Sequence, residues 1–245
     1  MMENGTGRRH LAKTPMNRTL VIMAKAPRLG SVKTRLAKNL PMQAVTELYR
    51  CLLNDTIALA QALDQVDVAI MCPASDAKDL SRSVAKAVPV VPQTGDGLAA
   101  GLVSVFTHFA ALGCQRIIAF NSDSPHLPVS VLETAFDLLT TCDVVVGPTH
   151  DGGYYLVGAR ASHPGLFDND GMGTANALEA LLERASNLEL SVRIIDPFYD
   201  IDVAADLSQL ADELQRMPEK APRTAAWLIE WRRALSERRS SIGAP

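Results

Sequence analysis

Short apolar runs alternate along most of the chain with longer segments in which apolar residues recur every three or four positions. Short apolar runs bounded by turn residues indicate strands, and the three-to-four-residue period indicates amphipathic helices. The pattern predicts strands over residues 19–23, 66–71, 88–91, 116–120, 144–147, 154–159 and 192–195. It predicts helices over residues 42–63, 77–87, 98–112, 130–139, 174–186, 203–216 and 224–237.

This alternation predicts the fold class. Strands separated by helices form right-handed βαβ units, and these build a mostly parallel sheet with helices on both faces. One segment differs, because the strand over 144–147 is followed only by residues 148–153 before the next strand begins. No crossover helix fits there, so the strand over 154–159 should run antiparallel or lie in another layer. We therefore expect an α/β chain with a single-domain, three-layer α/β/α architecture and a mixed, mostly parallel sheet.

The expected organisation is a disordered tail over residues 1–17, a domain over 18–217 and a C-terminal helix and tail over 218–245. The last segment mixes several arginines with Trp227, Leu228 and Trp231. We interpret it as an amphipathic helix that docks on the domain and keeps a solvated basic face. The alternative is a contact with a partner or with a second copy in a homodimer.

Charge and cysteine content exclude several classes of protein. With 24 Lys and Arg against 27 Asp and Glu, the net charge is −3, so no global positive field favours nucleic acid. No apolar stretch reaches membrane-spanning length, and the polar N-terminal residues do not resemble a signal peptide. The four cysteines lie far apart without metal-binding spacing and are expected to be free thiols. No flanking motif supports a catalytic cysteine. Because free thiols are typical of cytosolic proteins, we expect a cytoplasmic protein that binds no membrane.

The segment that follows the first predicted strand carries four cations, Lys25, Arg28, Lys33 and Arg35, within residues 24–36. Like charges at this density favour an anionic ligand, and the end of a parallel strand is where phosphates bind in α/β proteins. The loop has neither the Walker A spacing nor the glycine pattern of a dinucleotide-binding turn. A solvated basic loop without a ligand is the alternative.

Carboxylates follow two other predicted strands. Asp123 follows the strand over 116–120 and is expected to face the ligand crevice, where it suits Mg²⁺ or Mn²⁺. Its alternative role as a helix cap is less favoured, because Ser130 is better placed to cap the next helix. Asp200 and Asp202 lie two residues apart in an extended segment, so they face the same way and repel each other unless a cation or a basic cluster lies between them. Asp202 is alternatively the N-cap of the helix over 203–216.

Two glycine-containing turns are further candidates. Asp151, Gly152 and Gly153 permit close approach of a ligand, although Asp-Gly is also a common hairpin turn. The adjacent Tyr154 and Tyr155 should point to opposite faces of a strand, one into the core and the other toward the cleft. The turn over residues 93–98 offers backbone amides to a nucleobase, or is a plain turn between a strand and a helix.

These motifs together resemble a known group of transferases. Residues 24–36, Ser122-Asp123-Ser124-Pro125, residues 151–158 and the Asp200-Ile201-Asp202 segment stand in the order found in the radical-SAM/selenodomain-associated transferase family. That family belongs to the nucleotide-diphospho-sugar transferase superfamily with a GT-A-like fold. It is similar to molybdenum-cofactor cytidylyltransferases and to 2-phospho-L-lactate guanylyltransferase. The resemblance extends from about residue 19 to residue 207.

The resemblance implies roles for particular residues. It implies catalytic roles for Lys33, Arg35 and Asp123, and metal ligation of Mg²⁺ or Mn²⁺ by Asp123 and Asp202. The implied nucleotide-binding residues are Ala24, Lys25, Ala26, Arg28, Gly30, Lys33, Arg35, Gly95, Gly97 and Ser122. The implied acceptor-binding residues are Asp151, Gly152, Gly153 and Tyr154.

Two departures from the family pattern are visible. Relatives tend to have arginine in a segment that here reads Leu98 to Leu102, and often tryptophan where this chain has residues 170–173.

Three functions remain open from the sequence. The first is a metal-dependent nucleotidyltransferase that moves a nucleoside monophosphate from a nucleoside triphosphate to a small phosphorylated acceptor. The second is a glycosyltransferase that uses a nucleotide sugar on the same fold. The third is a nucleotide-binding module without catalysis, which the missing arginine favours.

Overall fold

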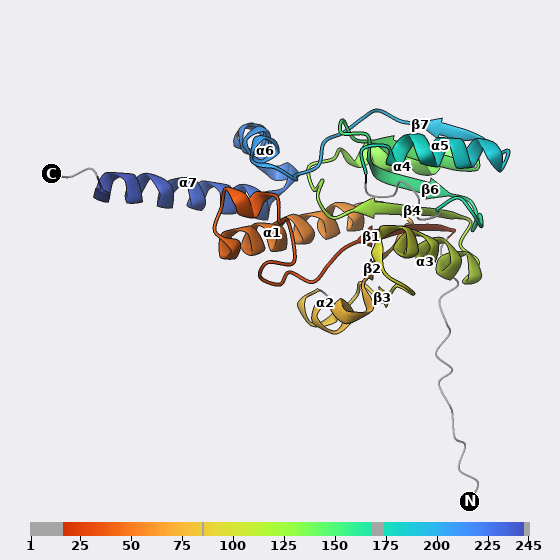
Figure 1. Cartoon of the computed structure of the whole chain (residues 1–245), viewed down its shortest axis with the longest axis horizontal. Coiled ribbons are helices and arrows are strands. Elements are labelled where there is room, and N and C mark those ends of the chain that lie inside the picture. Colours follow the sequence, from red (N-terminus) through yellow and green to blue (C-terminus); the bar gives the residue numbers. More distant parts are fainter. Residues whose placement is uncertain (1–16, 85, 168–173, 243–245) are drawn as a thin grey trace, which may run out of the picture.

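The computed structural model describes residues 17–84, 86–167 and 174–242, with side chains as far as residue 234 (Figure 1). The predicted tail over residues 1–17 thus lies, apart from Asn17, outside the described residues, as do residues 170–173. The strands are β1 (Arg18–Met23), β2 (Asp67–Cys72), β3 (Val90–Pro92), β4 (Arg116–Asn121), β5 (Val144–Pro148), β6 (Tyr154–Ala159) and β7 (Val192–Ile194). The α-helices are α1 (Met42–Gln61), α2 (Ala77–Ser83), α3 (Gly97–Ala111), α4 (Val129–Leu138), α5 (Ala177–Asn187), α6 (Ala204–Arg216) and α7 (Pro222–Ile242).

The seven described strands form one sheet in the order β3-β2-β1-β4-β6-β5-β7. The pairs β1–β2, β1–β4, β2–β3 and β5–β7 are parallel, whereas β6 runs antiparallel to both of its neighbours, β4 and β5. The strand that follows residues 148–153 is therefore the antiparallel one, which is the first of the two arrangements expected for so short a connection. The mixed, mostly parallel sheet predicted from the sequence is confirmed.

Helices cover both faces of this sheet, which gives the expected three layers (Figure 1). On one face, Leu53 and Ile57 of α1 and Phe136 of α4 pack on Ile22 and Phe120 of the strands. The opposite face is covered by α3 and α5, whose apolar side chains pack on the other side of the same strands, including Val21 and Val157. Strand residues alternate between the two clusters because successive side chains point to opposite faces.

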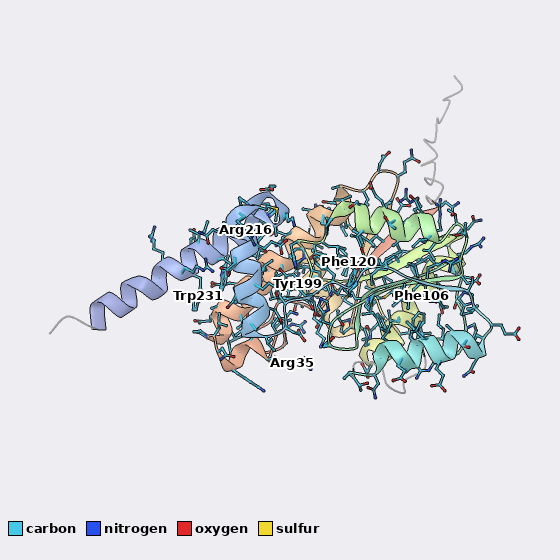
Figure 2. All side chains as sticks on the ribbon, turned by 90° about the horizontal axis from the view of Figure 1, so that it is seen from above. Arg35, Phe106, Phe120, Tyr199, Arg216 and Trp231 are labelled. Carbon is cyan, nitrogen blue, oxygen red and sulfur yellow. The ribbon has the colours of Figure 1, made fainter. Side chains whose placement is uncertain are left out.

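A third apolar cluster lies beyond the sheet, where α6 and α7 pack on α1 and on the loop that precedes it. It includes Leu48, Leu52, Ile201, Leu210 and Leu228. The start of α7 is fixed by the buried Asp55 of α1, whose carboxylate accepts hydrogen bonds from the backbone N–H and the hydroxyl of Thr224, both at 2.8 Å. The first turns of α7 therefore dock on the domain, and the rest of the helix extends away from it (Figures 1 and 2). Figure 2 shows Trp231 on this extending part and Tyr199 between α6 and the sheet.

Two helix ends differ from the predicted ones. The helix expected over 77–87 ends at Ser83, because Val84 adopts an extended conformation and packs against the core. The helix expected to begin at Ser130 begins at Val129 with Pro128 in the N-cap position, so Ser130 does not cap it.

The four cysteines are free thiols, as expected, and three of them are buried. Among the described helices, none has both the length and the apolar character needed to cross a membrane.

Candidate active site

A cavity of about 650 Å³ opens at the carboxyl edge of the sheet, above the ends of β1, β2 and β4. This volume is typical of small-molecule sites, and the carboxyl edge of an open α/β sheet is where ligands bind. The predicted site residues that line it are Ala24, Lys25, Lys33, Arg35, Gly97, Ser122, Asp123 and Asp202. The basic loop, the segment after β4 and the segment after β7 therefore meet in one cavity.

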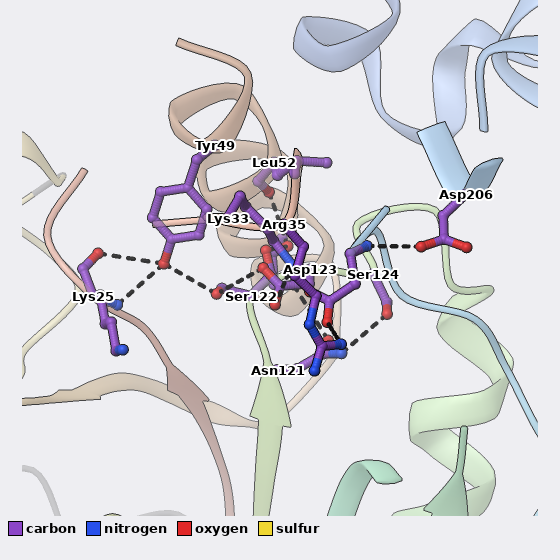
Figure 3. Close-up of polar contacts among 12 residues, drawn as sticks. Lys25, Lys33, Arg35, Tyr49, Leu52, Asn121, Ser122, Asp123, Ser124 and Asp206 are labelled. Atoms are coloured by element: carbon purple, nitrogen blue, oxygen red, sulfur yellow. Dashed lines mark hydrogen bonds and ion pairs between the residues drawn. The ribbon is translucent and has the colours of Figure 1, made fainter. Parts of the chain in front are cut away.

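Lys33 lies at the centre of this meeting point (Figure 3). Its Nζ is 2.8 Å from Oδ2 of Asp123 and 3.0 Å from Oδ1 of Asp202, and only 4% of its side chain is exposed. Burial alone would lower the pKa of this ammonium, but the charges of Asp123 and Asp202 raise it well above its usual value. Lys33 is therefore a buried, permanently charged cation held between two carboxylates.

Arg35 binds the same group of carboxylates from the solvent side. Its Nη1 is 3.0 Å from Oδ2 of Asp202, and 62% of its side chain is exposed. An exposed arginine on a flexible stem is free to reach a bound phosphate, because its present ion pair is weak and screened.

Asp202 is available for this contact because a different residue closes the start of α6. Oδ2 of Asp206 accepts hydrogen bonds from the backbone N–H groups of Asp202 and Val203, at 2.9 and 2.7 Å. The N-cap position is Val203, so the alternative role of Asp202 as the helix cap is wrong. Its carboxylate faces the cavity instead.

Asp200 is a third carboxylate of the same cluster and was not among the predicted metal ligands. Asp123, Asp200 and Asp202 each offer an oxygen, and these atoms lie within 4.8 Å of one another. Burial raises the pKa of Asp200 to about 6. The charge of Lys33 opposes this shift, and the charges of the neighbouring carboxylates add to it. The sequence signal for its place in the cluster is the Asp-x-Asp spacing of Asp200 and Asp202, since both side chains of such a pair in an extended segment face the same way.

These three residues are a chemically suitable set for a divalent ion. Carboxylate oxygens are the ligands that Mg²⁺ and Mn²⁺ prefer, and both ions usually complete their coordination with water and substrate phosphates. The position of Lys33 Nζ between Asp123 and Asp202 also shows that a cation is accommodated there. The residues present therefore fit the ion that was expected from the sequence.

Tyr49 is a residue of the cavity that the sequence analysis missed. It comes from α1, is 3% exposed, and its hydroxyl connects the two loops that carry the charges (Figure 3). The backbone N–H of Lys25 donates to it at 3.1 Å, and it shares a second hydrogen bond of 3.1 Å with Oγ of Ser122. Ser122 in turn donates to Asp123 at 3.3 Å. Burial, together with the charge of Asp123, raises the pKa of Tyr49 to about 12, so the phenol stays neutral.

Four predicted nucleotide-binding residues are not among those that line this cavity: Ala26, Arg28, Gly30 and Gly95. Arg28 points toward α2, where its guanidinium binds Asp76 and Asp79, each at 2.6 Å. The N–H of Ala26 donates to Asp76 at 2.8 Å, and the carbonyl of Gly95 accepts from Gln93 at 2.9 Å. These contacts hold the loops in place. The sequence alone could not distinguish residues with this structural role from residues that bind a ligand.

The glycine-rich turn before α3 forms one wall of the cavity. Gln93, Asp96, Gly97 and Leu98 line it, and the side-chain amide of Gln93 donates to the carbonyls of Gly95 and Gly97. A Cβ on Gly101, which stands in the segment where relatives tend to have arginine, would lie 2.7 and 2.8 Å from the side-chain ends of Met23 and Gln93, which would have to move. Gln93 and Met23 therefore occupy the space into which a side chain at position 101 would point.

Three of the four predicted acceptor-binding residues, Asp151, Gly152 and Gly153, form the turn between β5 and β6, and the fourth, Tyr154, begins β6. None of the four is among the residues that line the cavity. Gly152 has a φ of +87°, and a Cβ there would collide with the carbonyl of Ala175, so this glycine is required by the fold. The carboxylate of Asp151 lies within electrostatic reach of Asp200 and Arg35, next to the carboxylate cluster.

The two tyrosines of β6 point to opposite faces, as expected, but neither lines the cavity. Tyr155 is buried in the core that α1 and α4 share with the sheet, and Tyr154 packs against the core under α3 and α5.

His126 is a second residue that the sequence analysis missed. It is 1% exposed and lies against the rings of Phe198 and Tyr199, between the segment after β4 and the segment after β7. Neither ring nitrogen has a hydrogen-bond partner among the described residues. Burial lowers the pKa of the imidazole to about 4, so the ring is neutral at physiological pH.

Comparison with protein families gives a match to part of the chain. The family model described as "Uncharacterized protein conserved in bacteria (DUF2064)" matches residues 56–174, a span that includes Asp123 but neither Lys33 nor Asp202. No curated protein gave a match.

Among solved structures, a candidate nucleotide-diphospho-sugar transferase from Desulfovibrio desulfuricans is 26% identical, with a TM-score of 0.81. The match covers 87% of this chain and 94% of that one.

Two more distant structures share the fold. A nucleotidyl transferase from Methanothermobacter is 16% identical with a TM-score of 0.54, and the match covers 82% of this chain and 99% of that one. A 4-diphosphocytidyl-2C-methyl-D-erythritol synthase from Anaerococcus prevotii is 11% identical with a TM-score of 0.52, covering 81% and 97% of the two chains. The chain thus has the fold of the nucleotide-diphospho-sugar transferase superfamily, and the expected class of enzyme, a transferase, is confirmed.

Proposed function

We propose that this protein is a metal-dependent nucleotidyltransferase that moves a nucleoside monophosphate from a nucleoside triphosphate to a small phosphorylated acceptor. The observation that carries the proposal is the meeting of Lys33, Arg35, Asp123 and Asp202 in one cavity at the carboxyl edge of the sheet. Asp200 completes the carboxylate cluster beside them. Cations beside a cluster of carboxylates suit a ligand that brings both phosphates and a divalent ion. The names of the nucleotidyl transferase and the cytidylyl-type synthase with this fold agree with that interpretation.

In the proposed reaction, an oxygen of the acceptor phosphate forms a bond to the α-phosphorus of the triphosphate. The bond from that phosphorus to the α,β-bridging oxygen breaks, and its electron pair leaves with pyrophosphate. Asp123, Asp200 and Asp202 would hold Mg²⁺ or Mn²⁺, which when bound neutralises charge on the phosphate oxygens.

The protein side chains supply alignment and charge. Lys33 and Arg35 would contact the leaving pyrophosphate, and the negative charge that develops there is stabilised by their positive charges. The turn that holds Gly97 and Leu98 would lie beside the nucleoside, and the Asp151–Gly153 turn beside the acceptor. Correct alignment in such a site contributes much of the rate, since little covalent chemistry falls to the protein.

The assay that tests this proposal measures pyrophosphate released from each of the four ribonucleoside triphosphates. The protein is incubated with Mg²⁺ or Mn²⁺ and a set of small phosphorylated acceptors, and mass spectrometry identifies the product. Asp123→Asn should lower release by about a hundredfold or more, whereas Asp79→Asn, which removes an exposed carboxylate outside the cavity, should retain it. Absence of release with every triphosphate and acceptor would contradict the proposal.

A glycosyltransferase that uses a nucleotide sugar is the second candidate, and the name of the Desulfovibrio protein favours it. It would release a nucleoside diphosphate from a nucleotide sugar and no pyrophosphate from a triphosphate. Tight binding of metal and nucleotide without turnover of either donor would instead indicate a binding module. Membership of the radical-SAM/selenodomain-associated family, a cytoplasmic location and a homodimer belong to the same proposal.

A further inference from the structure

The contacts of Lys33 differ from what its proposed role requires. A lysine that holds the phosphates of a nucleotide must direct its ammonium toward the open part of the cavity. Here Nζ of Lys33 instead lies between Asp123 and Asp202, at 2.8 and 3.0 Å from their oxygens, with 4% of the side chain exposed. The same two carboxylates belong to the cluster that suits a divalent ion.

The backbone of Lys33 is also unusual. Its φ is +47°, in the left-handed region that side chains other than glycine rarely adopt. The other described non-glycine residues with positive φ are Gln65 and Glu189, which lie in turns outside the cavity. Strained backbone at a ligand site persists only when the surroundings hold it. Here the side chain of Lys33 is held by its two ion pairs, and its carbonyl accepts a hydrogen bond from the N–H of Ala37 at 3.2 Å.

We propose that Lys33 competes with the divalent ion for Asp123 and Asp202, so that the protein takes up the ion together with the phosphates of its substrate. An ammonium and a divalent ion between the same oxygens would repel each other strongly in a buried site, so one must leave when the other enters.

Phosphates make this exchange favourable. They give the displaced ammonium a new anionic partner in the same cavity, so that the ion and a polyphosphate each strengthen the binding of the other. This second step rests on the proposed function, whereas the competition itself depends only on the contacts of Lys33.

The test measures binding of Mn²⁺ alone, by titration of the purified protein and detection of free Mn²⁺ by electron paramagnetic resonance. Lys33→Gln removes the competing charge and should bind Mn²⁺ on the order of tenfold more tightly than the wild type, within the usual range of coupling between sites. The matched control is Lys25→Gln, which removes one positive charge from the same cavity without removing a contact to the carboxylates. Its affinity should stay within about threefold of the wild type, as expected for an exposed charge.

Further measurements keep the result unambiguous. Asp123→Asn in the Lys33→Gln background should remove the gained affinity, which locates the ion. If Lys33→Gln does not fold, as judged by circular dichroism, the wild type provides the test through acylation of its lysines. Millimolar Mn²⁺ should make Lys33 reactive and leave the reactivity of Lys25 unchanged.

Equal Mn²⁺ affinity of the wild type and Lys33→Gln would overturn the competition, as would unchanged acylation of Lys33. Because no nucleotide or acceptor is present, neither result depends on which group the enzyme transfers. Failure of the pyrophosphate assay would leave the Mn²⁺ result standing, and the reverse also holds.

Discussion

One loop supplies two clusters of charge that differ in almost every physical respect. Lys33 is buried between Asp123 and Asp202 in the cavity, whereas Arg28, five residues earlier, binds Asp76 and Asp79 beside α2 with 44% of its side chain exposed. The hydrogen bonds that Arg28 donates to Asp79 raise the pKa of its guanidinium, just as Asp123 and Asp202 raise the pKa of Lys33. Solvent nevertheless screens the exposed ion pairs of Arg28, so they contribute little. Charge density in the sequence therefore identifies the loop, but burial decides which of its cations belongs to the site.

The largest difference between the two clusters should appear when a carboxylate is replaced in each. Asp123→Asn removes a proposed metal ligand and the partner of Lys33, so turnover on the acceptor identified by the pyrophosphate assay should fall roughly a hundredfold to a thousandfold. Asp79→Asn removes only an exposed partner of Arg28 and should leave turnover near the wild-type value. Similar losses in both variants would show that the loop as a whole, not the cavity, carries the function.

The cations provide the next comparison. Lys33→Gln should lower kcat by about a hundredfold, because the leaving pyrophosphate loses a charge that it needs in the transition state. Arg28→Gln should change kcat by no more than about threefold, since an exposed ion pair outside the cavity contributes little. Steady-state kinetics at saturating triphosphate measures both values, and a large effect of Arg28→Gln would show that this residue also reaches the substrate.

The alternation of strands and helices made the fold predictable. The turn over 148–153 is too short for a crossover helix and predicted that β6 runs antiparallel or lies in another layer; it runs antiparallel within the sheet. Periodicity of apolar residues suffices for such predictions because each element must bury one face. The meeting of Lys33 with Asp123 and Asp202 followed from the rule that carboxyl ends of parallel strands share one edge.

Other parts of the site depend on contacts between segments far apart in the chain. Arg28 could not be separated from Lys33, because its partners Asp76 and Asp79 lie 48 and 51 residues away, on an element whose position the sequence does not give. Tyr49 lies among the buried positions of an amphipathic helix, where an aromatic residue indicates core and nothing else. A single histidine such as His126 gives no pattern at all.

Acid should lower the free energy of unfolding more through the buried His126 than through the cluster of the exposed Arg28 with Asp76 and Asp79. The pKa of His126 is lowered to about 4 by burial, so the unfolded chain binds a proton there at higher pH than the folded chain does. The contribution of the neutral His126 imidazole to stability is therefore fully present above its unfolded pKa of about 6.5. It is lost as the pH falls toward 4, which should lower the free energy of unfolding by about 2–3 kcal/mol.

His126→Phe keeps an aromatic ring between the segments after β4 and β7 and removes this dependence. Denaturant unfolding between pH 4 and pH 7.5 measures it in both proteins. Asp200, whose raised pKa contributes stability at low pH that is lost as the pH rises through about 6, acts in the opposite direction. It is present in both proteins, so the difference between them isolates His126. Equal pH profiles would show that the imidazole does not titrate in this range.

The smallest effect should come from the hydroxyl that connects the loop to the aspartates. Tyr49→Phe leaves the ring in place but removes the acceptor for the N–H of Lys25 and the partner of Ser122. We expect a loss of about 1–2 kcal/mol in unfolding free energy, because a buried donor loses its partner, and about a tenfold loss in turnover through misplacement of Asp123.

Tyr199→Phe is the matched control, since its hydroxyl donates to Glu213 at 2.7 Å and does not line the cavity. A comparable loss of stability in both variants, with loss of turnover only in Tyr49→Phe, separates positioning of the cavity from general packing. If turnover falls equally in both, Tyr49 acts only through the stability of the fold.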